Sequence, residues 1–237
     1  MTLDLRDWSD ASEDARLRWR ADAVGPALRA ALLPDLRSRG VARLQLLDDL
    51  GRHSERALCH LVAALAQELG APLPQRSAGD LLTLVRDEAA DYRSPEVRGH
   101  ATSAALGFHS DRCDLSLLLY VRVAASGGEV AVVGYDEVAD LLATRDPAAL
   151  ASLRAPIPFD LRPERIFERP TWHARPVLWD LGLGVRGHYI RRFITDSQRH
   201  PDCPRLRPDQ QRALNRLDEV LADLRPARTF TPRPGEL

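Results

Sequence analysis

Lysine is absent from this sequence of 237 residues, and asparagine occurs once, at Asn215. All 33 residues counted as Lys plus Arg are therefore arginines. This bias is typical of a GC-rich coding sequence, so an arginine by itself does not indicate a function. The formal net charge is −1, whereas proteins that bind nucleic acids usually carry a clustered basic excess. The composition therefore predicts no nucleic-acid partner.

Cysteine is scarce as well, with three residues at Cys59, Cys113 and Cys203. Their odd number and wide spacing predict neither a disulfide framework nor a CxxC site, which favours a reducing compartment. The longest apolar run, residues 115–121, is far shorter than the roughly 20 residues of a membrane helix. The N-terminus also lacks the pattern of a secretory signal. We expect a soluble, cytoplasmic protein without a membrane partner.

Helical periodicity and capping residues predict several helices. Ser54 is a good N-cap for a helix with Leu58, Leu61 and Leu65 on one face, and Gly70 ends it. Other helices are expected at residues 12–36 (interrupted at Gly25 and Pro34), 135–143, 147–153 and 208–224.

Short apolar segments between turns predict strands. They lie at residues 41–47, 81–85, 115–123, 129–133, 157–161, 177–180 and 185–193. Many short strands with helices before and between them indicate an α+β fold, built on a sandwich or jelly roll. We expect a single domain over residues 1–237, with a helical and strand part at about 1–100 and a jelly-roll part at about 101–237.

His109 and Asp111 are the residues that most suggest chemistry. Two positions apart on an extended chain, they point to the same side. A histidine and a carboxylate placed in this way are two corners of the facial triad that holds non-haem Fe(II). The motif alone is weak, because a polar turn with Asp111 as a cap and His109 hydrogen-bonded would have the same sequence.

The surrounding sequence resembles the TauD/TfdA (clavaminate synthase-like) family of Fe(II)- and 2-oxoglutarate-dependent dioxygenases. The similar segments are residues 97–102 (VRGHAT), 107–114 (GFHSDRCD), 117–122 (LLLYVR), 127–129 (GGE) and 230–237 (FTPRPGEL). Their order and spacing extend the resemblance over about residues 41–237. It implies a double-stranded β-helix (jelly-roll or cupin-like) core with flanking helices, whose last core strand is missing from this sequence.

The resemblance assigns His109 and Asp111 as the first two iron ligands, with Fe(II), the co-substrate 2-oxoglutarate and O2 as the reactants. In the family a distal His and an Arg that binds 2-oxoglutarate follow the segment that here ends at Leu237. Val130 stands where relatives often have a Thr that contacts 2-oxoglutarate. His188 is a candidate for the third ligand, although a lone histidine in a strand is usually structural.

Arg98 and Arg192 occupy segments that line the pocket in relatives, and a guanidinium suits a substrate carboxylate. Surface ion pairs are the competing interpretation for both. The resemblance implies hydroxylation, or another oxidation, of a small molecule such as an amino-acid-like or carboxylate metabolite. The alternative is a catalytically silent jelly-roll module that binds a ligand and has lost the distal His and the Arg.

Overall fold

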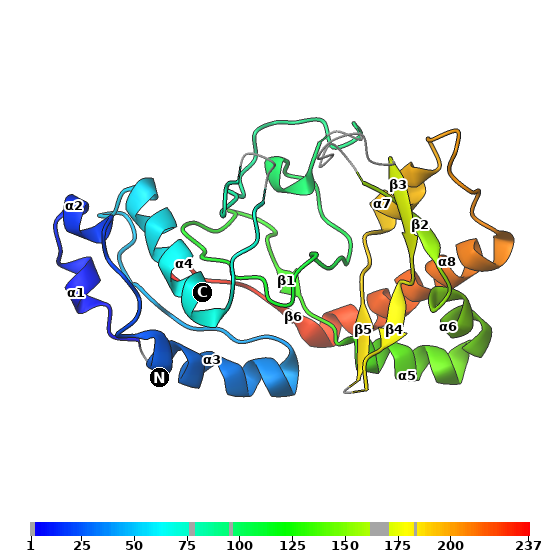
Figure 1. Cartoon of the computed structure of the whole chain (residues 1–237), viewed down its shortest axis with the longest axis horizontal. Helices are drawn as coiled ribbons and strands as arrows, with labels where there is room; N and C mark the ends of the chain where they lie inside the picture. Colours follow the sequence, from blue (N-terminus) through cyan, green and yellow to red (C-terminus); the bar gives the residue numbers. More distant parts are fainter. Residues whose placement is uncertain (1–2, 76–78, 95–96, 162–170, 183) are drawn as a thin grey trace. The chain divides into compact units, whose positions relative to one another are not determined.

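The computed structural model describes residues 3–75, 79–94, 97–161, 171–182 and 184–237 (Figure 1). They form two compact units, each with a hydrophobic core of its own. Unit 1 comprises Met1–Leu82, Cys113–Val132 and Thr229–Leu237, and unit 2 comprises Thr83–Arg112 and Val133–Arg228. The expectation of one domain over residues 1–237 stays a prediction.

The helices of unit 1 are α1 (Arg6–Ser9), α2 (Glu13–Arg16), α3 (Gly25–Arg39) and α4 (Glu55–Leu69). The predicted break at Gly25 is confirmed, since α3 begins there, but the predicted break at Pro34 is wrong. Leu28 and Leu32 of α3 are buried in the core of unit 1. Their apolar contacts offset the hydrogen bond that Pro34 cannot donate.

Helix α4 follows its sequence signals closely. The Ser54 hydroxyl accepts a hydrogen bond from the Ala57 N–H (3.1 Å), and Gly70 is the C-cap. Leu61 and Leu65 are fully buried in the same core. The predicted helix is thus confirmed, because its cap and its apolar face agree.

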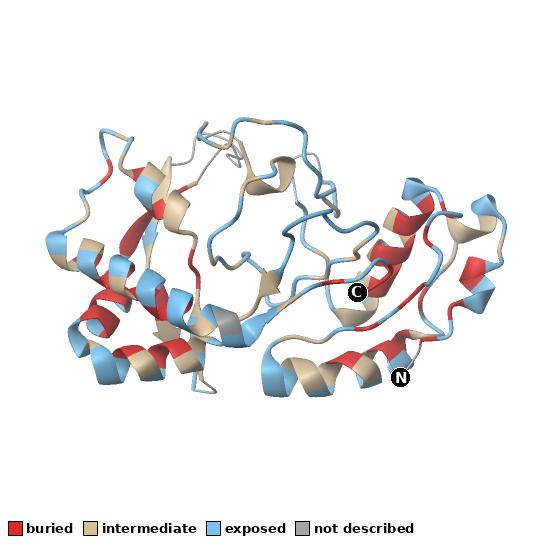
Figure 2. Cartoon of the chain, turned by 180° about the vertical axis from the view of Figure 1, so that it is seen from behind, coloured by how far each residue is buried: buried red, intermediate tan, exposed pale blue. Residues whose placement is uncertain are grey.

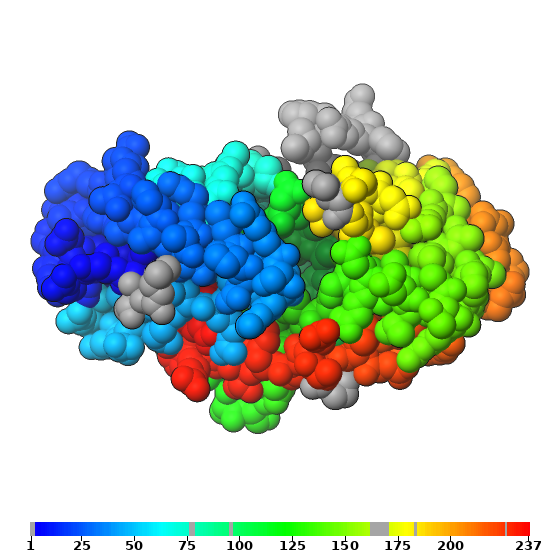
Figure 3. Space-filling view, turned by 90° about the horizontal axis from the view of Figure 1, so that it is seen from below, coloured from blue at the N-terminus to red at the C-terminus, as the bar shows by residue number. Residues whose placement is uncertain are grey.

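The C-terminal segment of unit 1 joins stretches that are distant in sequence. Leu44 and Leu237 exchange backbone hydrogen bonds of 3.0 and 2.8 Å, and Tyr120 bonds Gly235 (2.8 Å) and Glu236 (2.9 Å). In Figure 3 the red C-terminal residues lie against blue residues of the N-terminal region. The segments predicted as strands at 41–47 and 115–123 thus make isolated bonds to this terminus and form no ladder, so those predictions are wrong.

Strands β1 (Val130–Ala131) and β6 (Thr229–Phe230) pair antiparallel in unit 1. β1 confirms only the centre of the strand expected at 129–133. The 3-10 turn η2 (Arg225–Arg228) precedes β6.

Unit 2 is built on the helices α5 (Tyr135–Arg145), α6 (Pro147–Leu153), α7 (Arg191–Ser197) and α8 (Pro208–Leu224). Buried residues follow one side of these helices and exposed residues the other (Figure 2). Leu142, Leu153, Leu214 and Leu217 are at most 1% exposed in the shared core. The helices predicted at 135–143, 147–153 and 208–224 are confirmed.

The strands of unit 2 form two antiparallel pairs. β2 (Ile157–Asp160) pairs with β3 (Trp172–Arg175), and β4 (Leu178–Asp180) pairs with β5 (Val185–Gly187). The 3-10 turn η1 (Gly99–Ala101) also lies in this unit.

Two further strand predictions are wrong. The strand expected at 185–193 ends at Gly187, and α7 begins at Arg191 after the extended residue Ile190. Residues 81–85 form no strand, because they are largely exposed, with Val85 at 68%, and have no ladder partner.

The described residues therefore form a mixed fold of helices and short strands, consistent with the α+β prediction. Their three sheets are two-stranded and do not confirm a jelly-roll core. None of the described helices combines the length and apolar character needed to cross a membrane.

Candidate functional site

The His-x-Asp motif lies in unit 2, on a stretch of chain paired with the segment that enters α7. His109 forms an isolated antiparallel bridge with Ile190. The Ser110 N–H donates to the Tyr189 carbonyl at 2.9 Å. These contacts hold the motif in the extended conformation.

The Ser110 side chain fixes which way the motif faces. Its hydroxyl accepts hydrogen bonds from the Tyr189 N–H (3.0 Å) and from the Tyr135 hydroxyl (2.9 Å). Neighbouring side chains of an extended chain point to opposite sides. His109 and Asp111 therefore lie on the side away from these bonds, and both are exposed.

The imidazole of His109 is oriented by its own loop. Its Nδ1 lies 2.9 Å from the Gly107 carbonyl oxygen. A carbonyl only accepts, so Nδ1 carries the proton and donates it. The lone pair of the neutral ring is then on Nε2, the arrangement in which a backbone carbonyl orients a metal-binding histidine.

His188 follows β5 and is 2% exposed. Its ring packs against Phe159 with the centroids 5.2 Å apart, and its Nε2 is buried without a partner among the described residues. Burial, followed by the charges of Arg175 and Arg112, lowers the pKa of His188 to about 4. The ring is therefore neutral near pH 7, which suits either a metal or a hydrogen-bonding ligand.

The structure does not bring three ligands together. Within the described ranges, no group of three or more His, Cys, Asp or Glu is placed to hold a metal ion. His109 and Asp111 supply donors of the right kind, but His188 does not complete a ligand set with them.

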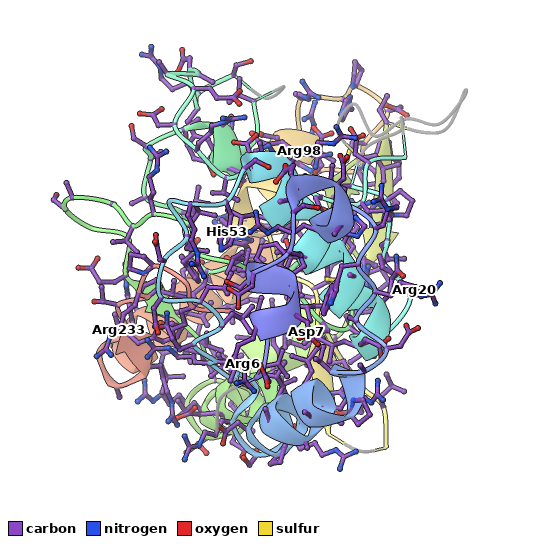
Figure 4. The ribbon with its side chains drawn as sticks, turned by 90° about the vertical axis from the view of Figure 1, so that its left-hand side faces the viewer. Arg6, Asp7, Arg20, His53, Arg98 and Arg233 are labelled. Atoms are coloured by element: carbon purple, nitrogen blue, oxygen red, sulfur yellow. The ribbon has the colours of Figure 1, made fainter. Side chains whose placement is uncertain are left out.

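Arg192 is engaged by its surroundings. Its guanidinium donates to the Ser94 carbonyl (2.6 Å), lies 3.4 Å from the Asp196 carboxylate and sits 4.0 Å from the Tyr92 ring centroid. These contacts attach residues 92–94 to α7. Arg98, labelled in Figure 4, is half-buried and immediately precedes η1. A substrate role for either arginine stays a prediction.

Comparison with known families assigns the chain. The model of the family described as "Taurine catabolism dioxygenase TauD, TfdA family" matches residues 7–237. The chain belongs to this family. The resemblance inferred from the motifs is thereby confirmed.

A curated relative supports the assignment to the TauD/TfdA family. FR-33289 synthase of Streptomyces rubellomurinus (strain ATCC 31215) is 30% identical over 138 residues, which are 58% of this chain and 41% of that protein. The match thus covers less than half of the relative.

In this TauD/TfdA chain, neither Arg175 nor His173 was among the site residues predicted from the sequence. Both lie on β3, and both are half-buried. The sequence signal was their spacing of two, as in the His-x-Asp motif. It could not be interpreted without the strand that pairs with β3.

Proposed function

We propose that the protein is an Fe(II)- and 2-oxoglutarate-dependent oxygenase that hydroxylates, or otherwise oxidises, a small molecule. The family match over residues 7–237 carries the proposal. The geometry supports it, because the His109 tautomer leaves Nε2 free and Asp111 faces the same side. A carboxylate or amino-acid-like metabolite is the proposed substrate class, and a jelly roll is the proposed core.

The residues of this chain have separate tasks in the proposed site. His109 Nε2 and the Asp111 carboxylate would hold iron, which together with 2-oxoglutarate would supply the oxygen chemistry. Ser110, bonded to Tyr135 and Tyr189, keeps both ligands on the exposed side of this extended segment. These donors fit iron in kind and fall one short in number among the described residues.

Two observations favour the alternative, a silent module that binds a ligand. The described residues do not assemble a third ligand, and Val130 of β1 has no hydroxyl to offer 2-oxoglutarate. The two functions differ in whether an iron chelate forms.

An anaerobic titration of the 237-residue chain with Fe(II) and 2-oxoglutarate distinguishes them. The oxygenase predicts a visible charge-transfer band that is lost in His109→Ala. The matched control is His60→Ala in unit 1, where His60 Nε2 bonds the Trp19 carbonyl at 2.8 Å; it should keep the band. Absence of the band from the folded chain would reject catalysis by this chain and leave the binding module.

A further inference from the structure

One face of the β2–β3 ladder gathers polar side chains that the proposed iron site does not use. The antiparallel register places Phe159 opposite His173 and Ile157 opposite Arg175. Directly opposed residues share a face, so these four side chains lie on one side of the ladder. The rings of Phe159 and His173 stack with centroids 5.7 Å apart, and His188, which follows β5, packs against Phe159.

The carboxylate of this ladder lies on the opposite face. Asp160 is fully buried, 2.9 Å from the Arg199 guanidinium and 3.3 Å from His200 Nε2. The charge of the Asp160 carboxylate is therefore compensated by Arg199 on that face, and not by Arg175. The face with Phe159 has a cation and imidazoles, and the ladder adds no acid to it.

Arg175 differs from most arginines of this chain. Surface arginines such as Arg20, which is labelled in Figure 4 and has a side chain 81% exposed, pair with a nearby carboxylate, here that of Asp22. The half-buried Arg175 has no carboxylate partner in the described part of the chain, and its guanidinium lies 4.9 Å from the Trp179 ring centroid. Burial and then the charge of Arg112 lower the pKa of Arg175. A cation held there is destabilising until an anion compensates it.

The two imidazoles offer unused hydrogen-bonding atoms beside this cation. His188 Nε2 and His173 Nδ1 are buried and have no partner among the described residues. Buried polar atoms are nearly always hydrogen-bonded, so two unpaired imidazole nitrogens on the face that carries Arg175 point to an absent ligand. A neutral imidazole has one N–H, so each of the two rings can donate one hydrogen bond to a ligand.

We propose that Arg175, with His173 and His188, forms a binding site for the oxyanion group of a small organic acid. The planar guanidinium would bind two oxygens of a carboxylate, and the imidazole N–H groups would donate to the same anion. The inference deepens the proposed function by adding an anion site in unit 2. It rests on that function only for the source of the anion, which is 2-oxoglutarate or the organic acid to be oxidised.

The test is calorimetric titration of the whole chain, freed of metals on a chelating resin, with 2-oxoglutarate, glutarate and inorganic phosphate. We expect saturable binding of at least one anion and a loss of affinity of about 10- to 100-fold in Arg175→Gln, the range for a hydrogen-bonded charge. Arg212→Gln is the matched control, because Arg212 is exposed on α8 and loses the same charge. It should bind within about twofold of the unsubstituted chain.

The anions differ in what they identify. Preference for 2-oxoglutarate over glutarate would assign the site to the co-substrate, since the two differ only in the keto group. Equal binding of both, or stronger binding of phosphate, would assign it to the oxyanion of the substrate. Binding of none of the three, or equal affinity of Arg175→Gln and the unsubstituted chain, would overturn the proposal.

Two further measurements keep the result decisive. Arg175→Lys keeps the charge and loses the planar fork, so we expect an intermediate affinity; it replaces Arg175→Gln if circular dichroism shows that variant unfolded. No iron takes part in the titration. If the chain binds an anion through Arg175 but gives no iron band, the oxygenase alone is rejected. If the chain gives the iron band but its anion binding does not depend on Arg175, the anion site alone is rejected.

Discussion

Ser110→Ala tests whether the hydroxyl between the two predicted iron ligands holds the motif in place. The substitution removes an acceptor that two donors share, the Tyr189 N–H and the Tyr135 hydroxyl. Leaving a buried donor unsatisfied costs about 1–3 kcal/mol. Tyr189 is buried and Tyr135 is only half-buried, so water can replace some of the loss at the Tyr135 hydroxyl. We therefore expect the free energy of unfolding of the chain to fall by about 2–3 kcal/mol in total.

Urea unfolding followed by circular dichroism measures this change, with Ser103→Ala as the matched control. Ser103 is exposed and has no hydrogen bond among the described residues, so its substitution should change stability by less than about 0.5 kcal/mol. Combining Ser110→Ala with Tyr135→Phe gives a double-mutant cycle, in which we expect a coupling of about 0.5–1.5 kcal/mol.

The iron titration adds a second measurement to the same variant. Ser110→Ala should weaken the charge-transfer band that His109 and Asp111 support, because the segment that carries them loses the hydrogen bonds that fix the direction of its side chains. Equal stability of Ser110→Ala and Ser103→Ala, or a coupling of zero, would refute the view that this hydroxyl holds the motif.

Two further predictions concern the core of unit 2. Burial lowers the pKa of His188 from the ordinary histidine value of 6.5 to about 4, so below pH 6.5 the unfolded chain binds more protons at this position than the folded chain. The contribution of His188 to the free energy of unfolding should fall by up to about 3 kcal/mol as the pH drops from 6.5 to 4. Urea unfolding of His188→Gln should lack this part of the pH dependence. Parallel curves of unfolding free energy against pH for the two chains would contradict the prediction. Leu217→Ala in α8 should cost about 2–5 kcal/mol in urea unfolding, because Leu217 is 1% exposed, while the half-buried Leu224→Ala should cost clearly less; equal losses would contradict the assigned helix face.

Local signals in the sequence were enough for most helices. The signals of α4 are its cap at Ser54 and its apolar face, and α8 has an apolar face of its own. Within each helix these residues are close together in the sequence, so the sequence specifies both helices directly. Gly25 likewise marked the start of α3, although Pro34 did not end it. The burial of Leu28 and Leu32 in α3 outweighed the tendency of Pro34 to end a helix.

Strands were harder to predict, because a strand exists only with a partner. Residues 41–47 and 115–123 have strand-like composition, yet their backbone partners lie at 235–237, and the contacts remain isolated. The segment after Gly187 also has strand composition and turns into α7 at Arg191. Pattern alone does not decide between such outcomes.

The sequence by itself determined helices α5, α6 and α8 of unit 2, the His109–Asp111 motif and, through the order of its motifs, membership of the TauD/TfdA family. These depend on residues close in the chain or on their order along it. Only the tertiary structure decided that Arg175 and His173 share a face with Phe159 and that His188 is buried beside them. That grouping depends on the register between β2 and β3, and a shift of one residue would turn Arg175 to the opposite face.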